Sequence, residues 1–395
     1  MIDWQELESK YYMQTIVRVP VTLVRGEGAR VWDDQGREYL DFVCGLAVNC
    51  LGHCPAVVAD AVTEQVRTLT QTSNWYFTIP QIRLAELLIK NSCLDKAFIC
   101  NSGLEANEGA VKLARRYGHL KLNGAYEVIS TMDSFHGRSL AMTAASGQSK
   151  MHAPFEPLPV GFINVANNDI EAIKTATTAK TCAVMLEPVQ AEGGVNITTD
   201  DYLKKVREWC DGKDILLILD EVQTGIGRLG ALFGYELYGI EPDIMTLAKG
   251  LGGGIPLGAL LAKEKASVFT VGDHNSTFGG NPVTSAAGYA TVKYILDNDI
   301  VGNARKVGQY LMDRLEGLRS KFKSITDVRG RGLLVAIEFD GDVAGSLLMA
   351  CLNRGLLVNR VKPNALRFIP PLIIGNDEVD EAVGILTEAL TEIYS

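Results

Sequence analysis

Six short apolar runs recur through the middle of the chain and constrain its fold more than any other feature. Glycine or polar residues follow each run, and patterns typical of helices separate them. In chain order the runs are AFIC, EVIS, CAVML, ILLILD, IMTLA and LGALLA. Strands buried on both faces have this continuous apolar character, and strands that alternate with helices pair in parallel. The pattern predicts an α/β fold, in which residues 60–285 form a large domain with a mostly parallel sheet flanked by helices.

The two ends of the chain have a different pattern. Residues 29–42 read ARVWDDQGREYLDF, with alternating apolar residues around a DQG turn that is typical of a hairpin. After Pro282 a helical stretch extends to about Lys323, and the segments ITDVRGRGLLVAIEF, GLLVNRV and ALRFIP then predict strands before a closing amphipathic helix. We expect residues 1–59 and 286–395 to build a smaller α+β domain together.

Composition narrows the classes of partner. Lys plus Arg number 38 and Asp plus Glu number 47, so the net charge is -9. An acidic balance argues against nucleic acid or an anionic membrane as the main partner. The segment MIDWQELESKYY lacks the features of a signal peptide, and no apolar run approaches the length of a membrane span. The eight scattered cysteines fit reduced thiols, and a cytoplasmic protein that acts on small molecules is expected.

Two weaker motifs suggest other functions. Cys50, His53 and Cys54 lie close together, but no second Cys or His pair has ligand spacing, so we predict no metal site. Residues 225–230, GIGRLG, match a dinucleotide-binding fingerprint, which requires glycines directly after a strand and a helix that begins on them. Here Asp220 and Glu221 intervene, and the following ALFGYELYGIEP is a poor helix. A dinucleotide-binding protein is the alternative from another functional class.

Two charged residues end neighbouring predicted strands. Asp220 ends ILLILD, and Lys249 follows IMTLA. Ligands bind at the carboxyl ends of parallel strands, and a buried carboxylate needs a positive partner. A plain ion pair between the two is one interpretation. The other is a pyridoxal phosphate site, where a lysine amine condenses with the cofactor aldehyde and an acid keeps the ring nitrogen protonated.

A pyridoxal phosphate site would also need groups that bind the phosphate beside Asp220 and Lys249. Residues 97–118, AFICNSGLEANEGAVKLARRYG, predict a strand, then Ser102 and Gly103, then a helix from Leu104. The N-terminus of a helix with such residues binds anions readily. Ordinary capping by Ser102, with Glu105 in the first turn, explains the same residues, and the two interpretations are compatible.

Other candidate residues follow further predicted strands. Phe135 and Arg138 come after EVIS, where a ring can stack on a cofactor and a guanidinium can bind a carboxylate. A core phenylalanine and a surface arginine are the plain alternatives. Glu187 and Glu192 lie at another strand end, where either also fits a solvated loop acid. Arg367 lies in an apolar strand, where a lone charge needs a ligand or an acid.

Motifs in order along nearly the whole chain resemble those of the class III, fold type I pyridoxal-phosphate aminotransferases. They include RVWDDQGREYLDF, NSGLEANE, SFHGRS, EPVQAEGG, DEVQTGIGR, PDIMTLAKGLGGGIP, GDHNSTFGGNP and LRFIPPL. So many motifs in one order are highly specific. Within this class the chain resembles the acetylornithine aminotransferases.

The resemblance implies a set of cofactor contacts. Lys249 would form the Schiff base and move the proton between substrate and cofactor, Asp220 would pair with the pyridine nitrogen, and Phe135 would stack on the ring. The remaining implied cofactor contacts are Ser102, Gly103 and Leu104 at the phosphate and Gln223 at the ring hydroxyl. Glu221 and Val222, next to Gln223 in the sequence, are also implied as cofactor contacts.

The resemblance also implies substrate contacts and a homodimer. Thr277 would reach the phosphate of the neighbouring subunit, and Ser276 would contact substrate across the same interface. Arg138 would hold the carboxylate of 2-oxoglutarate or of acetylornithine. Arg367 would hold the second carboxylate of glutamate, and Glu192 would pair with Arg367 when the substrate has an uncharged tail.

The implied reaction transfers the δ-amine of N-acetylornithine to 2-oxoglutarate, in arginine biosynthesis. Other ω-amine donors are the alternatives: ornithine, succinylornithine, succinyl-diaminopimelate and 4-aminobutyrate.

Two residues depart from the family pattern, since Leu104 replaces a usual threonine, serine or alanine and Ile16 replaces a usual tyrosine. Leu46 favours an acylated donor, because ornithine aminotransferases carry a tyrosine there.

Overall fold

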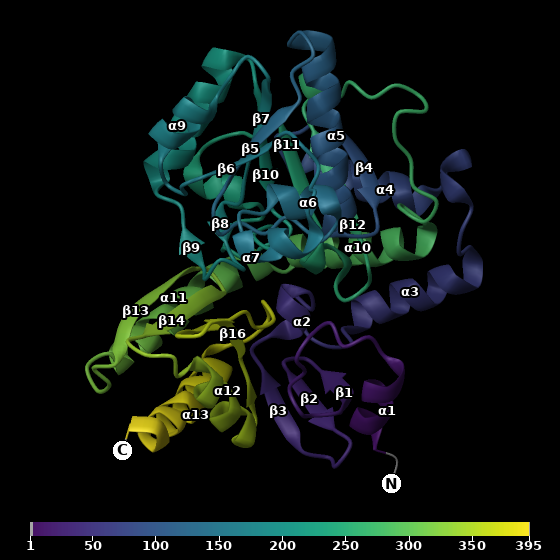
Figure 1. Cartoon of the computed structure of the whole chain (residues 1–395). Coiled ribbons are helices and arrows are strands. Elements are labelled where there is room, and N and C mark those ends of the chain that lie inside the picture. Colours follow the sequence, from purple (N-terminus) through teal and green to yellow (C-terminus); the bar gives the residue numbers. More distant parts are fainter. Residues whose placement is uncertain (1–2, 395) are drawn as a thin grey trace.

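A seven-stranded sheet forms the centre of the molecule in the computed structural model, which describes residues 3–394 (Figure 1). The strand order is β4-β12-β11-β10-β7-β5-β6. All neighbouring pairs are parallel except the two made by β12, which is antiparallel to β4 and β11. The predicted α/β fold with a mostly parallel sheet is confirmed.

Six of the seven strands match the predicted apolar runs. β6 is not predicted, because its sequence FINV is short and only partly buried at the sheet edge. The strands are β4 (Lys96–Cys100), β5 (Glu127–Thr131), β6 (Phe162–Val165), β7 (Thr181–Leu186), β10 (Leu216–Asp220), β11 (Ile244–Leu247) and β12 (Gly258–Ala262).

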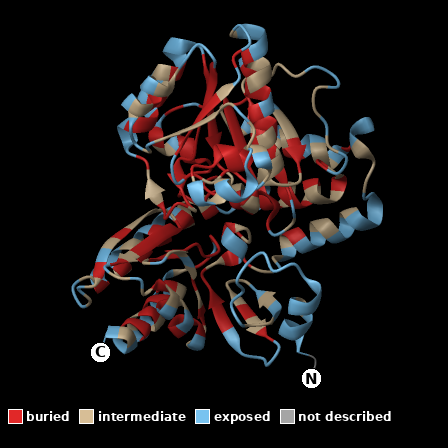
Figure 2. Cartoon of the chain, in the orientation of Figure 1, coloured by how far each residue is buried: buried red, intermediate tan, exposed pale blue. Residues whose placement is uncertain are grey.

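Helices cover both faces of this sheet, and its strands are therefore the most deeply buried part of the chain (Figure 2). Ile218 of β10 packs in the apolar cluster of α5 (Gly103–Lys121), whereas Leu217 and Leu219 pack in the cluster of α9 (Asp200–Lys213). Side chains alternate between the two faces of a strand, so a strand buried on both faces must be apolar throughout. This explains the continuous apolar runs.

The remaining elements of the sheet-containing region are short helices, 3-10 turns and one small hairpin. They are α6 (Leu140–Ala145), α7 (Ser149–His152), η2 (Ala153–Phe155), α8 (Ile170–Ala176), β8 (Val189–Gln190), β9 (Asn196–Ile197), η3 (Gly234–Tyr238), η4 (Lys249–Gly252) and η5 (Glu264–Ala266).

The N-terminal elements include the predicted hairpin, formed by β2 and β3 in antiparallel register around Gly36. They are α1 (Trp4–Tyr11), β1 (Leu23–Glu27), β2 (Arg30–Asp33), β3 (Glu38–Asp41), α2 (Cys44–Ala47), α3 (Ala56–Thr68), η1 (Ser73–Trp75) and α4 (Ile79–Lys90).

The C-terminal elements follow in the predicted order, with one difference. The helical stretch after Pro282 is two helices, because Asp299 adopts a left-handed conformation and its side chain caps the second at Gly302. The elements are α10 (Pro282–Asp297), α11 (Ile300–Leu318), β13 (Ile325–Arg331), β14 (Leu334–Phe339), α12 (Ala344–Asn353), β15 (Leu356–Leu357), β16 (Asn359–Lys362), β17 (Ala365–Phe368) and α13 (Asn376–Tyr394).

The two ends of the chain meet in a shared sheet. β15, from the C-terminal part, pairs in parallel with β3, which extends the order to β1-β2-β3-β15. Figure 1 shows these elements together beneath the large sheet. The division into residues 1–59, 60–285 and 286–395 stays a prediction. Among the helices of residues 3–394, none has the length and apolar content needed to cross a bilayer.

Candidate active site

The ends of two neighbouring strands bring Asp220 and Lys249 to one cavity. β10 and β11 are parallel, with Asp220 opposite Thr246, and Lys249 follows two residues after β11 ends. Both residues line a cavity of about 570 Å³. No hydrogen bond or ion pair joins the Lys249 amine to another residue of the described chain. The plain ion pair between Asp220 and Lys249 is therefore wrong.

Lys249 is held in an unusual state. Its φ of +46° lies in the left-handed region, which residues with side chains adopt rarely. Burial lowers the pKa of its amine, although the charges of Glu192 and Asp220 act in the opposite direction. A lowered pKa increases the fraction of neutral amine, the form that acts as nucleophile and base.

Asp220 is fixed by a buried hydrogen-bond network. Its Oδ2 accepts from Asn107 Nδ2 at 2.8 Å and lies 2.8 Å from His136 Nδ1, and its Oδ1 accepts from the Val222 amide at 3.0 Å. Thr246 Oγ1 in turn donates to Asn107 Oδ1 at 2.6 Å. Burial acts to lower the pKa of His136, but its hydrogen bond to Asp220 and the charge of that acid raise it overall. The network fixes the position of the buried Asp220 carboxyl group at the end of β10.

Asn107, His136 and Thr246 are site residues that the sequence analysis does not predict. They come from α5, from the loop after β5 and from β11, and only the folded sheet brings them to one point. One signal is present in the sequence, since Asn107 lies on the buried face of a helix, where a polar side chain needs a partner.

The N-terminus of α5 points its first amides at the cavity. Ser102 caps the helix by accepting from the Glu105 amide at 3.2 Å, and Ser102, Gly103 and Leu104 all line the cavity. The first amides of a helix have no acceptor within it. A Cβ at Gly103 would lie 2.7 Å from Val222 Cγ1, so only glycine fits there. Capping and anion binding are compatible here, as expected.

Phe135 and Arg138 form another wall of the cavity. Phe135 is partly buried, and its amide donates to Glu187 Oε1 at 2.9 Å. Burial, with a further contribution from the charge of Asp220, raises the pKa of Glu187 to about 7, although His136 opposes this. The Arg138 guanidinium lies 5.4 Å from the centre of the Phe135 ring and has no carboxylate partner among the residues described.

Arg367 and Glu192 form the ion pair that the sequence analysis expects. Arg367 is completely buried on β17, and its NH1 donates to Glu192 Oε1 at 2.8 Å and to Gln223 Oε1 at 3.2 Å. Gln223 Nε2 donates to the same Glu192 oxygen at 3.0 Å. Burial acts to raise the pKa of Glu192, but Arg367 and then Lys249 lower it to about 2. Glu192 and Gln223 line the cavity, and Arg367 lies behind them.

Glu221 is placed differently from the predicted cofactor contact. Its carboxylate accepts from the amides of Gly234 and Tyr235 and from the Thr224 hydroxyl, and it does not line the cavity. Successive residues at a strand end point to opposite sides, so Glu221 points away from the site that Asp220 faces. The structure corrects this prediction.

Ser276 and Thr277 lie near the cavity without lining it. Ser276 Oγ accepts from Asn101 Nδ2 at 3.2 Å, and Asn101 does line it. Thr277 is exposed. Their predicted contacts across a subunit interface stay a prediction.

The GIGRLG segment forms a loop. η3, a short 3-10 turn, is the first helical element after it, so no α-helix begins on these glycines. Arg228 within the loop is buried and donates to the carbonyls of Leu333 and Pro370. The dinucleotide-binding alternative is wrong, because the geometry it requires is missing from this segment.

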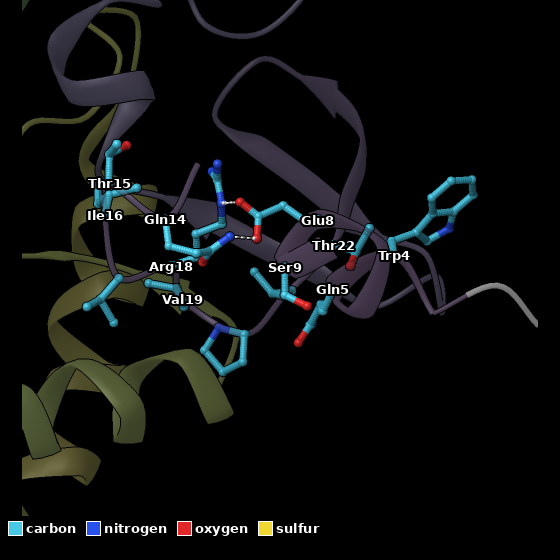
Figure 3. Close-up of a pocket in the computed structure, with 13 residues that line it drawn as sticks. Trp4, Gln5, Glu8, Ser9, Gln14, Thr15, Ile16, Arg18, Val19 and Thr22 are labelled. Atoms are coloured by element: carbon cyan, nitrogen blue, oxygen red, sulfur yellow. Dashed lines mark hydrogen bonds and ion pairs between the residues drawn. The ribbon is translucent and has the colours of Figure 1, made fainter. Parts of the chain in front are cut away.

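A larger cavity, of about 740 Å³, lies between α1 and residues 14–22 (Figure 3). Glu8 binds Arg18 at 2.7 Å and Gln14 at 3.0 Å beside it. Ile16 lines this cavity and not the cavity of Lys249. None of the predicted catalytic or cofactor residues lines it, so its size does not make it the reactive site.

Comparison with known proteins assigns the family. Residues 11–390 match the family model Aminotransferase class-III. The chain belongs to this family. It is 51% identical to an acetylornithine aminotransferase of Caldanaerobacter subterraneus subsp. tengcongensis, over 98% of both chains.

Solved structures agree with this assignment. An N-acetylornithine aminotransferase from Stenotrophomonas maltophilia superposes with a TM-score of 0.85 at 36% identity, over 98% of this chain and 99% of that one. An ornithine aminotransferase from Toxoplasma gondii, described with partial occupancy of PLP at its active site, gives 0.93 at 31% identity, over 98% and 94% of the two chains.

The cofactor of this family is pyridoxal phosphate, and the groups around the cavity fit it. Within residues 3–394, the structure provides a lysine amine without a partner, a buried acid with one oxygen free of side-chain donors, helix amides without acceptors and an aromatic face. Lys249, Asp220, Gly103, Leu104 and Phe135 are the residues that would hold it.

Glu221 gives a stability prediction that is independent of the cofactor. Burial raises the pKa of its carboxyl to about 7 in the folded protein. Because the pKa of this carboxyl is higher in the folded than in the unfolded protein, the carboxyl increases the free energy of unfolding at low pH. This contribution to stability is lost as the pH rises from about 4.5 to about 7. The unsubstituted protein therefore loses stability across this range, whereas Glu221→Gln does not. We expect the melting temperature of Glu221→Gln minus that of the unsubstituted protein, measured by differential scanning calorimetry, to increase with pH.

An exposed acid serves as the control for that measurement. Glu208 lies exposed on α9, so Glu208→Gln should show no such trend. A melting-temperature difference for Glu221→Gln that is constant between pH 5 and pH 8 would contradict a raised pKa.

Proposed function

We propose that this protein transfers the δ-amino group of N2-acetyl-L-ornithine to 2-oxoglutarate, giving N-acetyl-L-glutamate 5-semialdehyde and L-glutamate, in arginine biosynthesis. The observation that carries the proposal is the state of two arginines at the cavity of Lys249, whose amine has no partner among the described residues. Arg138 has no acid partner among the residues described, whereas Arg367 is neutralised by Glu192. Arg138 can thus bind the single carboxylate of the donor. Arg367 can bind the second carboxylate of the acceptor once Glu192 has moved away from it.

The residues divide the chemistry between them. When bound, pyridoxal phosphate supplies an electron sink that stabilises negative charge on the substrate carbon. The Nζ of Lys249, whose lowered pKa favours the neutral amine, takes the proton from the δ-carbon of the donor. Asp220 Oδ1, which accepts only the Val222 amide within the described chain, holds the proton on the ring nitrogen. Water supplies the oxygen of the aldehyde that leaves, and the amino group, which the bound cofactor would carry between the two half-reactions, passes to 2-oxoglutarate in exchange for the keto oxygen, which leaves as water.

The Glu192–Arg367 pair allows one site to accept two unlike substrates. A buried arginine without an acid is strongly unfavourable, so Glu192 stabilises the site around an uncharged acyl tail. When glutamate or 2-oxoglutarate enters, its second carboxylate replaces Glu192 on Arg367. Glu192 is partly exposed to the cavity, with 29% of its side chain accessible, and so has room to move.

We propose a homodimer in which Ser276 and Thr277 complete the partner's site. Trp75 and Phe77 are 84% and 96% exposed on the segment that contacts this loop, where Asn74 Nδ2 donates to Ser276 O at 2.7 Å. Such apolar exposure is typical of a protein interface. A monomer in sedimentation equilibrium at micromolar concentration would contradict the proposal.

The cytoplasm is the proposed location, because the eight cysteines are free thiols, and a reducing compartment keeps thiols in that state. Recovery of the protein outside the cytoplasmic fraction of cells would contradict it.

The donor is tested by the spectrum of the bound cofactor. We expect N-acetylornithine, added without keto acid, to remove the visible absorption band much faster than ornithine or 4-aminobutyrate at equal concentration. The reason is that Glu192 neutralises Arg367, so the uncharged tail of an acylated donor meets no unpaired cation at that side of the cavity. Faster reaction with another ω-amine would contradict the choice of donor while leaving the fold and cofactor in place.

Glu192→Gln tests the proposed exchange at Arg367. Without the carboxylate, an uncharged tail leaves Arg367 buried and unpaired, so kcat/KM for N-acetylornithine should fall by roughly tenfold or more. The glutamate half-reaction, which brings its own carboxylate, should fall much less. Single-turnover kinetics of the two half-reactions measure this, with Glu208→Gln on the far surface as control, and equal losses would contradict the role.

A further inference from the structure

The turn 191–195, which joins β8 to β9, carries Glu192 into the cavity of Lys249. Its backbone is unusual, with φ of +116° at Gly194 and +56° at Val195. A positive φ at a β-branched residue is an outlier. Strained backbone persists only where the surrounding structure holds it. The contacts of this turn therefore bear on the position of Glu192.

Arg329 of β13 binds the carbonyl groups of the turn. Its Nε donates to the carbonyl oxygens of Gly194 at 3.0 Å and Val195 at 3.2 Å, and its NH2 donates to that of Gly194 at 2.7 Å. Its NH1 lies 2.7 Å from the carboxylates of Asp327 and Glu338, which hold the guanidinium in place. Figure 1 shows β13, from the C-terminal part of the chain, next to β9. The two regions are thus joined at this turn.

The backbone on either side of Glu192 is held as well. Ala191 is completely buried, and its carbonyl accepts from Arg367 NH1 at 2.9 Å. A Cβ at Gly193 would lie 2.4 Å from the carbonyl oxygen of Asp133, so the backbone there lies against the loop after β5. The side chain of Glu192, in contrast, is 29% accessible and faces the cavity. Its backbone is fixed while its side chain has room to move.

We propose that Arg329 is a positioning residue for the exchange at Arg367. It fixes the turn, so that Glu192 leaves Arg367 and returns to it by rotation of its side chain alone. When the hold of Arg329 is weakened, the backbone of Glu192 shifts and the Glu192–Arg367 pair loses its geometry. An uncharged tail then lies beside a buried arginine that is less well neutralised, which is unfavourable. This inference rests on the proposed function and adds to it a residue that does not line the cavity.

Arg331 provides a matched control on the same strand. It lies two residues after Arg329 on β13, so the two side chains leave the same face of the strand. Its NH2 also reaches the sheet-containing region, where it pairs with Asp200 of α9. Within residues 3–394, its side-chain hydrogen bonds and ion pairs involve no residue of the turn 191–195. Arg331 thus shares the setting of Arg329 without its contact to the Glu192 backbone.

The test compares Arg329→Lys with Arg331→Lys. Both keep the charge, but a lysine amine is a compact point charge and lacks the planar fork of donors. We expect Arg329→Lys to lower kcat/KM for N-acetylornithine about fivefold, with the glutamate half-reaction within about twofold, because glutamate brings its own carboxylate to Arg367. Arg331→Lys should leave both within about twofold. In hydrogen exchange followed by mass spectrometry, the peptide that spans β8 and β9 should exchange faster in Arg329→Lys only.

A double substitution separates this role from a general loss of stability. Because Arg329 acts through Glu192, Arg329→Lys in the Glu192→Gln background should lower kcat/KM for N-acetylornithine by less than about twofold further. The inference is overturned if the two effects multiply, if Arg331→Lys acts like Arg329→Lys, or if Arg329→Lys changes neither the exchange of the peptide nor the ratio of the half-reactions. Failure of the unsubstituted protein to use N-acetylornithine would instead overturn the proposed function, and the exchange of the peptide would still test the hold of Arg329 on the turn.

Discussion

The site depends on one constraint: the buried Lys249 amine has no hydrogen-bond or ion-pair partner in the part of the chain that the structure describes. The acids nearest to Lys249 are already bound, since Glu192 accepts from Arg367 and Asp220 accepts from Asn107. Because those carboxylates have other partners, no ion pair within residues 3–394 holds Nζ, and burial lowers the pKa of the amine. A lowered pKa increases the fraction of this amine that is free to react.

The fold supplies the conditions for that constraint. Parallel strands end at one edge of the sheet, so β10 and β11 deliver an acid and a lysine to the same cavity. The helix after β4 presents its first amides at that edge, and Gly103 allows its close approach to Val222. The C-terminal part of the chain adds Arg367 from β17. A single site thus combines charges from segments that are far apart in the sequence.

Much of this arrangement can be predicted from local pattern. Runs of apolar residues predict strands that are buried on both faces, and charges directly after such runs predict a site at the strand ends. Asp220 and Lys249 follow from that argument alone. β6 does not, because a short edge strand that is only partly buried lacks the apolar signal.

The rest depends on contacts between distant segments. The hydrogen bonds of Asp220 to His136 and Asn107 join three parts of the chain, and no local pattern encodes them. Glu221 shows that a shared motif does not fix the direction of each side chain, because Glu221 is adjacent to Asp220 in the sequence and points the opposite way. The four residues Cys44–Ala47 after β3 all have positive φ although only one is a glycine, so no local pattern predicts their conformation.

The central claim is that the Lys249 amine binds the cofactor covalently, and chemical reduction tests it most directly. The protein with its cofactor would be treated with borohydride, digested and mapped by mass spectrometry, with Lys249→Ala as the control. The account predicts that the reduced cofactor is attached to the peptide that contains Lys249 and that the control carries no label. A label on another lysine, or none on a protein that retains its cofactor, would contradict it.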